Sequence, residues 1–163
     1  MKTNKEKIDS YWLNKPEENV RFYFAYGSNI NQDQMAFRCN DALPVAIAYV
    51  RNFRFVINSM GVATIIPVSG LVVRGVLWQI SESDEKELDT YEGVSSNLYT
   101  KERCNVLVGD ENLESLVYIA TNSELGRPRK NYLETIIEGI VSFKGDKEWL
   151  NEVQFWKKNV RNA

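Results

Sequence analysis

The fold of this chain is decided at residues 21–29, which read RFYFAYGSN. A run of mostly aromatic residues that ends in glycine and two short polar residues predicts a strand leading into a tight turn. Asn31 follows, with Gln34 three residues later, a spacing typical of a helix N-terminus, and we expect this helix to extend to about Cys39. The turn therefore joins a strand to a helix, where the first backbone N–H groups have no acceptor within the helix.

Residues that favour strands dominate the chain after this helix. β-Branched and aromatic residues, bounded by Pro, Gly or Asn-Ser, predict six more strands. They are expected at residues 42–50, 53–58, 62–66, 72–80, 99–108 and 113–120. The last two are separated by residues 109–112, which read GDEN and are typical of a hairpin turn.

Three further helices are predicted. Ser81 opens one that continues to Tyr91 and stops at Gly93, and apolar residues at helical spacing indicate two more at residues 130–143 and 146–158. Strands that come first, with helices at intervals and at the end, favour an α+β fold over a doubly wound sheet. We expect a small mixed, largely antiparallel β-barrel of six to seven strands flanked by helices.

The length of 163 residues fits one domain with a substantial core. There is no internal repeat and no linker long enough to divide the chain. We expect an N-terminal leader at residues 1–19, which Trp12 and Leu13 would pack onto the body, and a folded domain at residues 20–163. A monomer or a homodimer is expected.

Composition excludes several classes of function. The net charge of −2 gives no general attraction to nucleic acid or to anionic membranes, and the basic cluster at residues 127–130 is too short to track a phosphate backbone. No segment approaches the roughly 20 apolar residues of a membrane-spanning helix, and the N-terminus lacks the apolar region of a secretory signal. We therefore expect a cytoplasmic protein that binds neither nucleic acid nor membranes.

The chain contains no histidine, which removes Ser-His-Asp and Cys-His catalysis and imidazole metal sites. Its two cysteines, Cys39 and Cys104, are far apart and form no Cys-x-x-Cys pattern, which argues against a zinc site or a disulfide framework. An enzyme with this composition must use carboxylates, lysines, tyrosines, hydroxyl groups and backbone dipoles.

Two local features are candidates for such chemistry. The turn at residues 26–29 presents backbone N–H groups at the positive end of a helix, where an anion can bind. Glu92 lies beside Gly93 at the negative end of another helix, with Asp89 three residues earlier, and both effects raise the pKa of a carboxyl group. Taken alone, each feature is more often structural: a capped turn in one case, an exposed helix-terminal glutamate in the other.

Together, the two segments resemble the γ-glutamylcyclotransferase family, which includes AIG2-like proteins. The resemblance is carried by FAYGSN at residues 24–29 and LDTYEGV at residues 88–94. Further matches follow the family's strands and its long C-terminal helix; they lie at residues 61–67, 73–78, 97–99, 118–122 and 128–140. The resemblance covers roughly residues 21–155, and it implies the γ-glutamylcyclotransferase-like fold.

The resemblance also implies a substrate site and a reaction. Glu92 would be the catalytic acid/base of an acyltransferase or lyase that forms 5-oxoproline, through attack of the substrate's α-amine on its own γ-carbonyl. No metal or cofactor is needed. The residues implied to bind a small γ-glutamyl substrate are Tyr26, Gly27, Ser28, Asn29, Tyr99 and Tyr132.

Three alternatives stay open at this point. The same chemistry is possible on a γ-glutamylamine or on a carrier protein, although the loop reads YGSN and not the YGTL of the γ-glutamylamine branch. The second alternative is a non-catalytic small-molecule-binding protein on the same fold. The third, a nucleic-acid protein, draws only on aromatic residues and the basic cluster. Arg127, Arg129 or Lys130 are also candidates to attract an acidic substrate tail.

Overall fold

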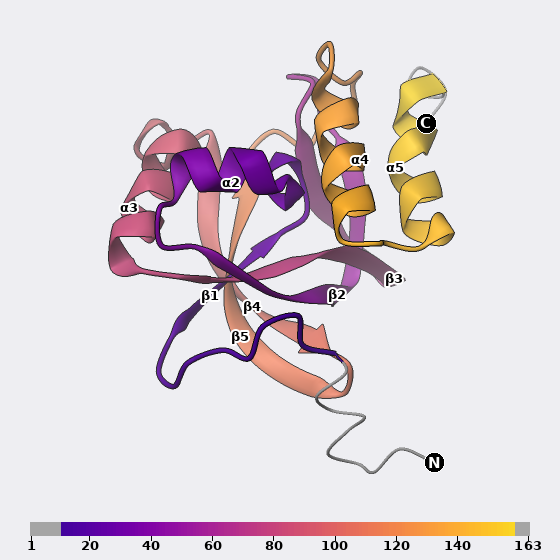
Figure 1. Cartoon of the computed structure of the whole chain (residues 1–163). Helices are drawn as coiled ribbons and strands as arrows, with labels where there is room; N and C mark the ends of the chain where they lie inside the picture. Colours follow the sequence, from indigo (N-terminus) through magenta and orange to yellow (C-terminus); the bar gives the residue numbers. More distant parts are fainter. Residues whose placement is uncertain (1–10, 159–163) are drawn as a thin grey trace, which may run out of the picture.

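The computed structural model describes residues 11–158, which form a barrel of strands with helices gathered over one part of its surface (Figure 1). The strands are β1 (Arg21–Ala25), β2 (Leu43–Ile57), β3 (Ala63–Ile80), β4 (Tyr99–Val108) and β5 (Glu111–Ala120). The α-helices are α2 (Gln32–Arg38), α3 (Glu82–Tyr91), α4 (Tyr132–Ser142) and α5 (Lys147–Lys158). Two short 3₁₀ helices are η1 (Ser28–Ile30) and η2 (Val94–Ser96).

The strands close into a barrel in the order β1-β3-β2-β4-β5. Neighbouring strands are antiparallel except β1 and β5, which pair in parallel at Tyr23 and Leu116. The prediction of an α+β fold with a mixed, largely antiparallel barrel and flanking helices is therefore confirmed.

The predicted count of six to seven strands is wrong, because the barrel has five. The segments expected at 42–50 and 53–58 are one long strand, β2, and those expected at 62–66 and 72–80 are β3. Asn52 has a left-handed φ of 65° at an irregularity of β2, and its side-chain oxygen accepts a hydrogen bond from the backbone N–H of Gly70 at 3.0 Å. Residues that normally form turns thus bend this strand pair without ending it.

The predicted helix termini match the structure closely. Asn31 caps α2, and its side chain accepts a hydrogen bond from the N–H of Gln34 at 3.2 Å. Ser81 and Asp84 form a reciprocal capping box at the start of α3. Gly93 follows the end of α3 with a φ of 63°, the left-handed conformation that favours glycine.

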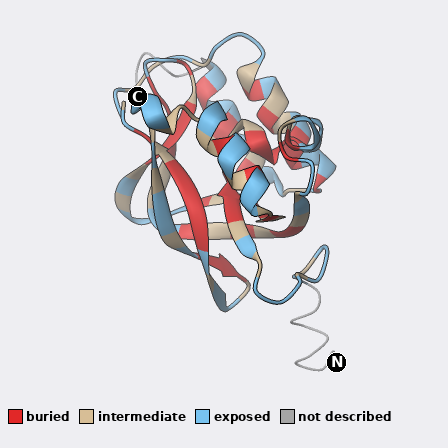
Figure 2. Ribbon diagram, turned by 90° about the vertical axis from the view of Figure 1, so that its left-hand side faces the viewer, coloured by how far each residue is buried: buried red, intermediate tan, exposed pale blue. Residues whose placement is uncertain are grey.

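The hydrophobic core fills the barrel and continues under the inner faces of α4 and α5 (Figure 2). Phe24 and Leu77 are fully buried inside the barrel, while Ile136 of α4 and Trp156 of α5 are buried against it. Each such side chain contributes about 1.5–3 kcal/mol relative to an exposed one.

Helix α4 also fixes the turn after β1. A Cβ atom added to Gly139 would lie 2.8 Å from the backbone nitrogen of Asn31, so only glycine allows this close approach. The side-chain amide of Asn31 donates to the carbonyl of Thr135 at 3.0 Å. The turn at residues 26–31 is therefore held by a helix that lies about 100 residues later in the sequence.

The described part of the predicted leader runs along the barrel. The N–H of Leu13 donates to the carbonyl of Val45 at 2.7 Å, and Trp12 packs on the core. Leu13 is 48% exposed, so about half of its surface is covered, and its predicted packing stays a prediction. Residues 1–10 lie outside the described residues, and the boundary at residue 19 stays a prediction. No helix within residues 11–158 is long and apolar enough to cross a membrane.

Candidate active site

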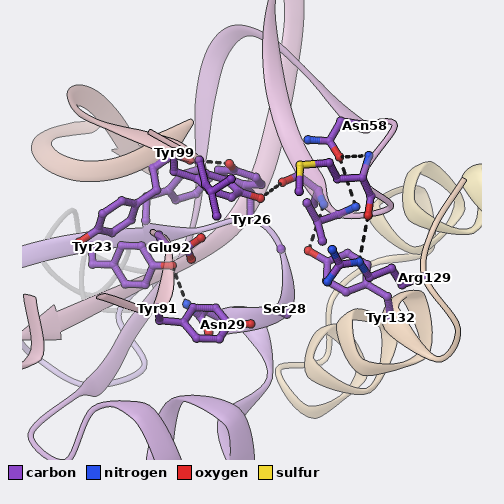
Figure 3. A pocket seen from close by; sticks show the side chains of 17 residues that line it. Tyr23, Tyr26, Ser28, Asn29, Asn58, Tyr91, Glu92, Tyr99, Arg129 and Tyr132 are labelled. Carbon is purple, nitrogen blue, oxygen red and sulfur yellow. Dashed lines mark hydrogen bonds between the residues drawn. The ribbon is translucent and has the colours of Figure 1, made fainter. Parts of the chain in front are cut away.

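A pocket of about 270 Å³ opens where β1 passes into η1 (Figure 3). All of the site residues predicted from the sequence line it, although they come from four different parts of the chain. They are Tyr26, Gly27, Ser28, Asn29, Glu92, Tyr99 and Tyr132. A volume near the lower end of the range for ligand sites suits a small molecule.

Backbone N–H groups at the start of η1 form one wall of the pocket. The N–H groups of Ile30 and Asn31 donate to the carbonyls of Gly27 and Ser28, both at 3.0 Å, and so close the first turn. The preceding N–H groups, those of residues 27–29, have no acceptor within this helix. They are positioned to donate to an anionic group of a ligand.

Gly27 leaves little room for a side chain. A Cβ atom at this position would lie 3.2 Å from the hydroxyl oxygen of Tyr132 and 3.3 Å from the Cβ of Ala63. A side chain would therefore crowd Tyr132 and fill the part of the pocket next to the turn.

Two tyrosine hydroxyls hold the backbone of one residue, Ala63, at the start of β3. Tyr99 donates to the carbonyl of Ala63 at 2.9 Å, and the N–H of Ala63 donates to the hydroxyl of Tyr132 at 3.0 Å. Burial raises the pKa of both, that of Tyr132 to about 12, so both are neutral near pH 7. Because the Tyr132 oxygen accepts from Ala63, its own O–H can donate to a ligand.

The polar side-chain groups of two predicted binding residues already form hydrogen bonds within the protein. The hydroxyl of Tyr26 donates to the carbonyl of Tyr118. The amide of Asn29 donates to the hydroxyl of Tyr23 at 3.0 Å, and its oxygen accepts from Arg38. These bonds hold the turn in place, so Tyr26 and Asn29 face the pocket with an aromatic ring and with backbone.

Glu92 supplies the pocket's carboxyl group from the end of α3. Its N–H donates to the carbonyl of Leu88 at 2.8 Å, and its half-buried side chain lies among the tyrosine rings (Figure 3). Burial raises the pKa of Glu92 to about 7, while the charge of Arg38 acts in the opposite direction.

The predicted rise in the pKa of Glu92 is thus confirmed in direction, but its predicted cause is wrong. Asp89 is directed elsewhere: it lies 3.0 Å from the ammonium of Lys101 and accepts from the hydroxyl of Tyr118 at 2.7 Å. Burial by residues distant in sequence, and not a neighbouring carboxylate, raises the pKa.

Sequence reasoning missed several residues of this region. Arg38 donates to the side chains of Ser28 and Asn29 and lies over the ring of Tyr91, 3.3 Å from its centroid. Met60 and Leu98 line the mouth and are 43% and 45% exposed. The sequence predicted that Arg38 lies in the last turn of this helix, but it did not indicate which residues Arg38 contacts.

Of the three basic residues proposed to attract an acidic tail, one lines the pocket. Arg129 lies on the side opposite Glu92, and its Nε donates to the carbonyl of Met60 at 2.9 Å (Figure 3). Arg127 and Lys130 are exposed and are not among the lining residues. Cys39 and Cys104 are both free, and residues 11–158 contain no group of three Cys, Asp or Glu side chains arranged to hold a metal ion.

Comparisons with known proteins agree with this architecture. The model of the AIG2-like family matches residues 72–143, a segment that includes Glu92, Tyr99 and Tyr132. The γ-glutamylcyclotransferase of Homo sapiens is 29% identical over 135 residues, which cover 76% of this chain and 72% of the relative. The chain is thus similar to the AIG2-like family and to γ-glutamylcyclotransferases.

Other relatives give the same result. The γ-glutamylcyclotransferase of Mus musculus is 29% identical over 128 residues, covering 72% of this chain and 68% of that protein. A solved structure titled γ-glutamyl cyclotransferase superposes with a TM-score of 0.78 and 26% identity, over 83% of this chain and 87% of the other. A solved human protein described as uncharacterized gives the same TM-score at 28% identity, over 84% and 88%. The predicted family and the predicted type of enzyme are confirmed.

Proposed function

We propose that this protein releases 5-oxoproline from a small γ-glutamyl compound by attack of the substrate's α-amine on its γ-carbonyl. The observation that carries the proposal is the half-buried carboxyl of Glu92, which lies in the same pocket as the N–H groups at the start of η1. That the protein is a cyclotransferase is supported by the relatives that carry this name.

The γ-glutamyl group would bind at the turn. The N–H groups of residues 27–29 would donate hydrogen bonds to the substrate's α-carboxylate, because they have no acceptor within the helix and lie at its positive end. The O–H of Tyr132 lies against the same turn and would add one more donor. Binding at these points folds the flexible glutamyl chain so that its amine approaches its own γ-carbonyl, and this proximity lowers the barrier.

Glu92 would then act first as a general base and afterwards as a general acid. Its carboxylate takes a proton from the α-ammonium, and the freed amine attacks the γ-carbonyl carbon to close a five-membered ring. As the bond from that carbon to the leaving nitrogen breaks, the Glu92 carboxylic acid returns the proton to that nitrogen. The ring nitrogen gives up its second proton through the regenerated Glu92 carboxylate to the departing amine, which leaves as an ammonium ion. A pKa of about 7 suits both steps near neutral pH.

No other lining residue fits this role. The only ionisable side chains in the pocket besides Glu92 are the tyrosines and Arg129. Burial raises the pKa of Tyr26 and Tyr99, so these hydroxyls keep their protons at neutral pH. Arg129 is a permanent cation and cannot act as a base.

We further propose that the leaving group carries a carboxylate. Arg129 is the only cation among the lining residues, and it lies across the pocket from Glu92 (Figure 3). The exposed apolar side chains of Met60 and Leu98 border the same mouth. This combination favours γ-glutamyl amino acids or peptides over γ-glutamylamines, since an amine leaving group offers nothing to Arg129.

The test is a panel of γ-glutamyl-alanine, glutathione, γ-glutamyl-ε-lysine and γ-glutamyl-ethylamide, with 5-oxoproline detected by mass spectrometry. We expect 5-oxoproline from at least one carboxylate-bearing substrate. If no compound yields 5-oxoproline although some bind in calorimetry, the protein is a non-catalytic binder and the proposal is wrong.

A further inference from the structure

We propose that Arg38 is a positioning residue, which fixes the substrate turn to the end of α3 and supplies the positive charge that keeps Glu92 available as a base. Arg38 does not line the pocket, so it would act through its neighbours. The inference rests on the proposed function for its kinetic consequences, but the state of Glu92 can be measured without turnover.

The first argument is geometric. The guanidinium group of Arg38 donates to the side-chain oxygens of Ser28 and Asn29, which belong to the turn. The same guanidinium group lies over the ring of Tyr91, with 3.3 Å between the Cζ atom of Arg38 and the centroid of the ring. Since Tyr91 directly precedes Glu92, one planar cation connects the two halves of the site, which are about 60 residues apart in the sequence.

The second argument is the absence of an anionic partner for Arg38. Two other cations of the described body have carboxylates within ion-pair distance: Lys101 pairs with Glu85 at 3.2 Å, and Arg74 pairs with Glu152 at 2.7 Å. Within residues 11–158, Arg38 forms no ion pair. Its charge is therefore not neutralised by another described carboxylate and can act on Glu92.

The third argument comes from the other groups around Glu92. The tyrosines that line the pocket with it come from five elements or their ends, namely Tyr23, Tyr26, Tyr91, Tyr99, Tyr118 and Tyr132. Neutral hydroxyls do not offset the cost of burying a carboxylate as a full charge does. Asp89 of the same helix is bound to Lys101, and Arg129 lies on the far side of the pocket. Arg38 is the cation that opposes the effect of burial on the pKa of Glu92.

The proposal assigns Arg38 two separable effects. Its hydrogen bonds to the turn should affect substrate binding, and its charge should set the pH at which Glu92 ionises. Without this charge, burial would act unopposed and a larger fraction of Glu92 would be protonated at neutral pH, where it cannot accept the substrate's proton.

The test compares Arg38→Gln, which removes the charge, with Arg38→Lys, which keeps it. Arg51→Gln is the matched control, because Arg51 is exposed on β2 and lies outside the pocket. For Arg38→Gln we expect the acidic limb of kcat/KM to move upward by about one pH unit, which lowers activity about fivefold at pH 7 and by less than about twofold at pH 9. Arg38→Lys should keep the wild-type limb but show a raised KM, and Arg51→Gln should match wild type in both.

A second measurement is independent of turnover. The carboxyl carbon of Glu92 is followed by NMR as a function of pH in the same variants, with Glu92→Gln used to assign the signal and thermal melting used to verify folding. An upward shift of the Glu92 midpoint in Arg38→Gln alone supports the inference, even if no γ-glutamyl compound is turned over. The inference is overturned if Arg38→Gln titrates as wild type does, or if Arg38→Lys shifts as far as Arg38→Gln.

Discussion

Helix α3 carries two glutamates in contrasting surroundings at its two ends. Near the start, Glu85 has a side chain that is 13% exposed and lies within 3.5 Å of Arg21, 3.2 Å of Lys101 and 3.3 Å of Arg103. At the end, Glu92 is half-buried among tyrosines and, within the described residues, has no ion pair.

From this difference we expect reactivity to depend on which carboxylate is left without a bonded cation. Three cations neutralise Glu85, which leaves it as a structural link between α3 and the barrel. Glu92 lacks such neighbours, and its pKa rises to about 7, within the range that proton transfer near neutral pH requires. Substituting the two residues in parallel tests whether the contrast determines function.

The largest expected effect is on catalysis. Glu92→Gln removes the acid/base while keeping the size of the side chain, and we expect kcat to fall about 10³-fold. Glu85→Gln, on the same helix, should change kcat by less than about twofold. Release of 5-oxoproline by both variants is measured by mass spectrometry, with circular dichroism to confirm the fold. Equal losses in the two variants would contradict the distinction between them.

The next effect is on pH dependence. Only ionised Glu92 can take the substrate's proton, so kcat/KM should fall toward a limit of about tenfold per pH unit below the pKa of about 7, or about fiftyfold between pH 7 and pH 5. A profile measured in buffers of constant ionic strength tests this. A limb with a midpoint near pH 4.5, the ordinary value for a glutamate, would show that Glu92 is not the titrating base.

A smaller effect is expected at the opposite side of the pocket. Arg129→Gln should raise KM about tenfold for γ-glutamyl-alanine, equivalent to about 1.4 kcal/mol, because a charge-assisted hydrogen bond is lost. The same variant should leave KM for γ-glutamyl-ethylamide unchanged. Lys130→Gln, which removes a nearby exposed charge outside the pocket lining, is the control. A similar change for both substrates would rule out recognition of the leaving group's carboxylate.

The smallest effect is on stability, and its sign differs between the two glutamates. The pKa of Glu92 is raised on folding, so the native state binds more protons than the unfolded state between about pH 4.5 and pH 7, and stability falls as pH rises through this window. Glu92→Gln should therefore be about 1 kcal/mol more stable than wild type at pH 8 and equal to it below pH 4.

Glu85→Gln should instead be about 1 kcal/mol less stable than wild type at pH 8, because it leaves three cations without their carboxylate. Urea unfolding at both pH values measures the two differences. If both variants shift in the same direction at pH 8, the contrast between the two ends of α3 is not electrostatic.

Features encoded in short segments could be predicted from the sequence. The caps at Asn31 and Ser81 and the left-handed Gly93 depend on neighbours within four residues, and all three were predicted. The strand count could not be predicted in the same way. Asn52 and Gly70 look like turn residues, yet they bond to each other across a strand pair and bend it.

The candidate site shows the same difference between features set by short segments and features set by distant residues. The residues themselves were identified because the resemblance connected segments far apart in the sequence. The environment of Glu92 was not, since its burial arises from tyrosines on separate elements and Arg38 acts from α2. Neither contact leaves a local pattern, so the pKa was predicted in direction but assigned to the wrong neighbour.

The hydroxyl pair that holds Ala63 has a consequence for how the site is assembled during synthesis. The turn at residues 26–29 is made early, but Tyr99 and Tyr132 reach Ala63 only after β4 and α4 have been translated. A nascent chain that ends before α4 would have Glu92 and the turn without the hydroxyl that lies against Gly27. Activity would therefore appear late on the ribosome, so that a partly made chain does not consume substrate.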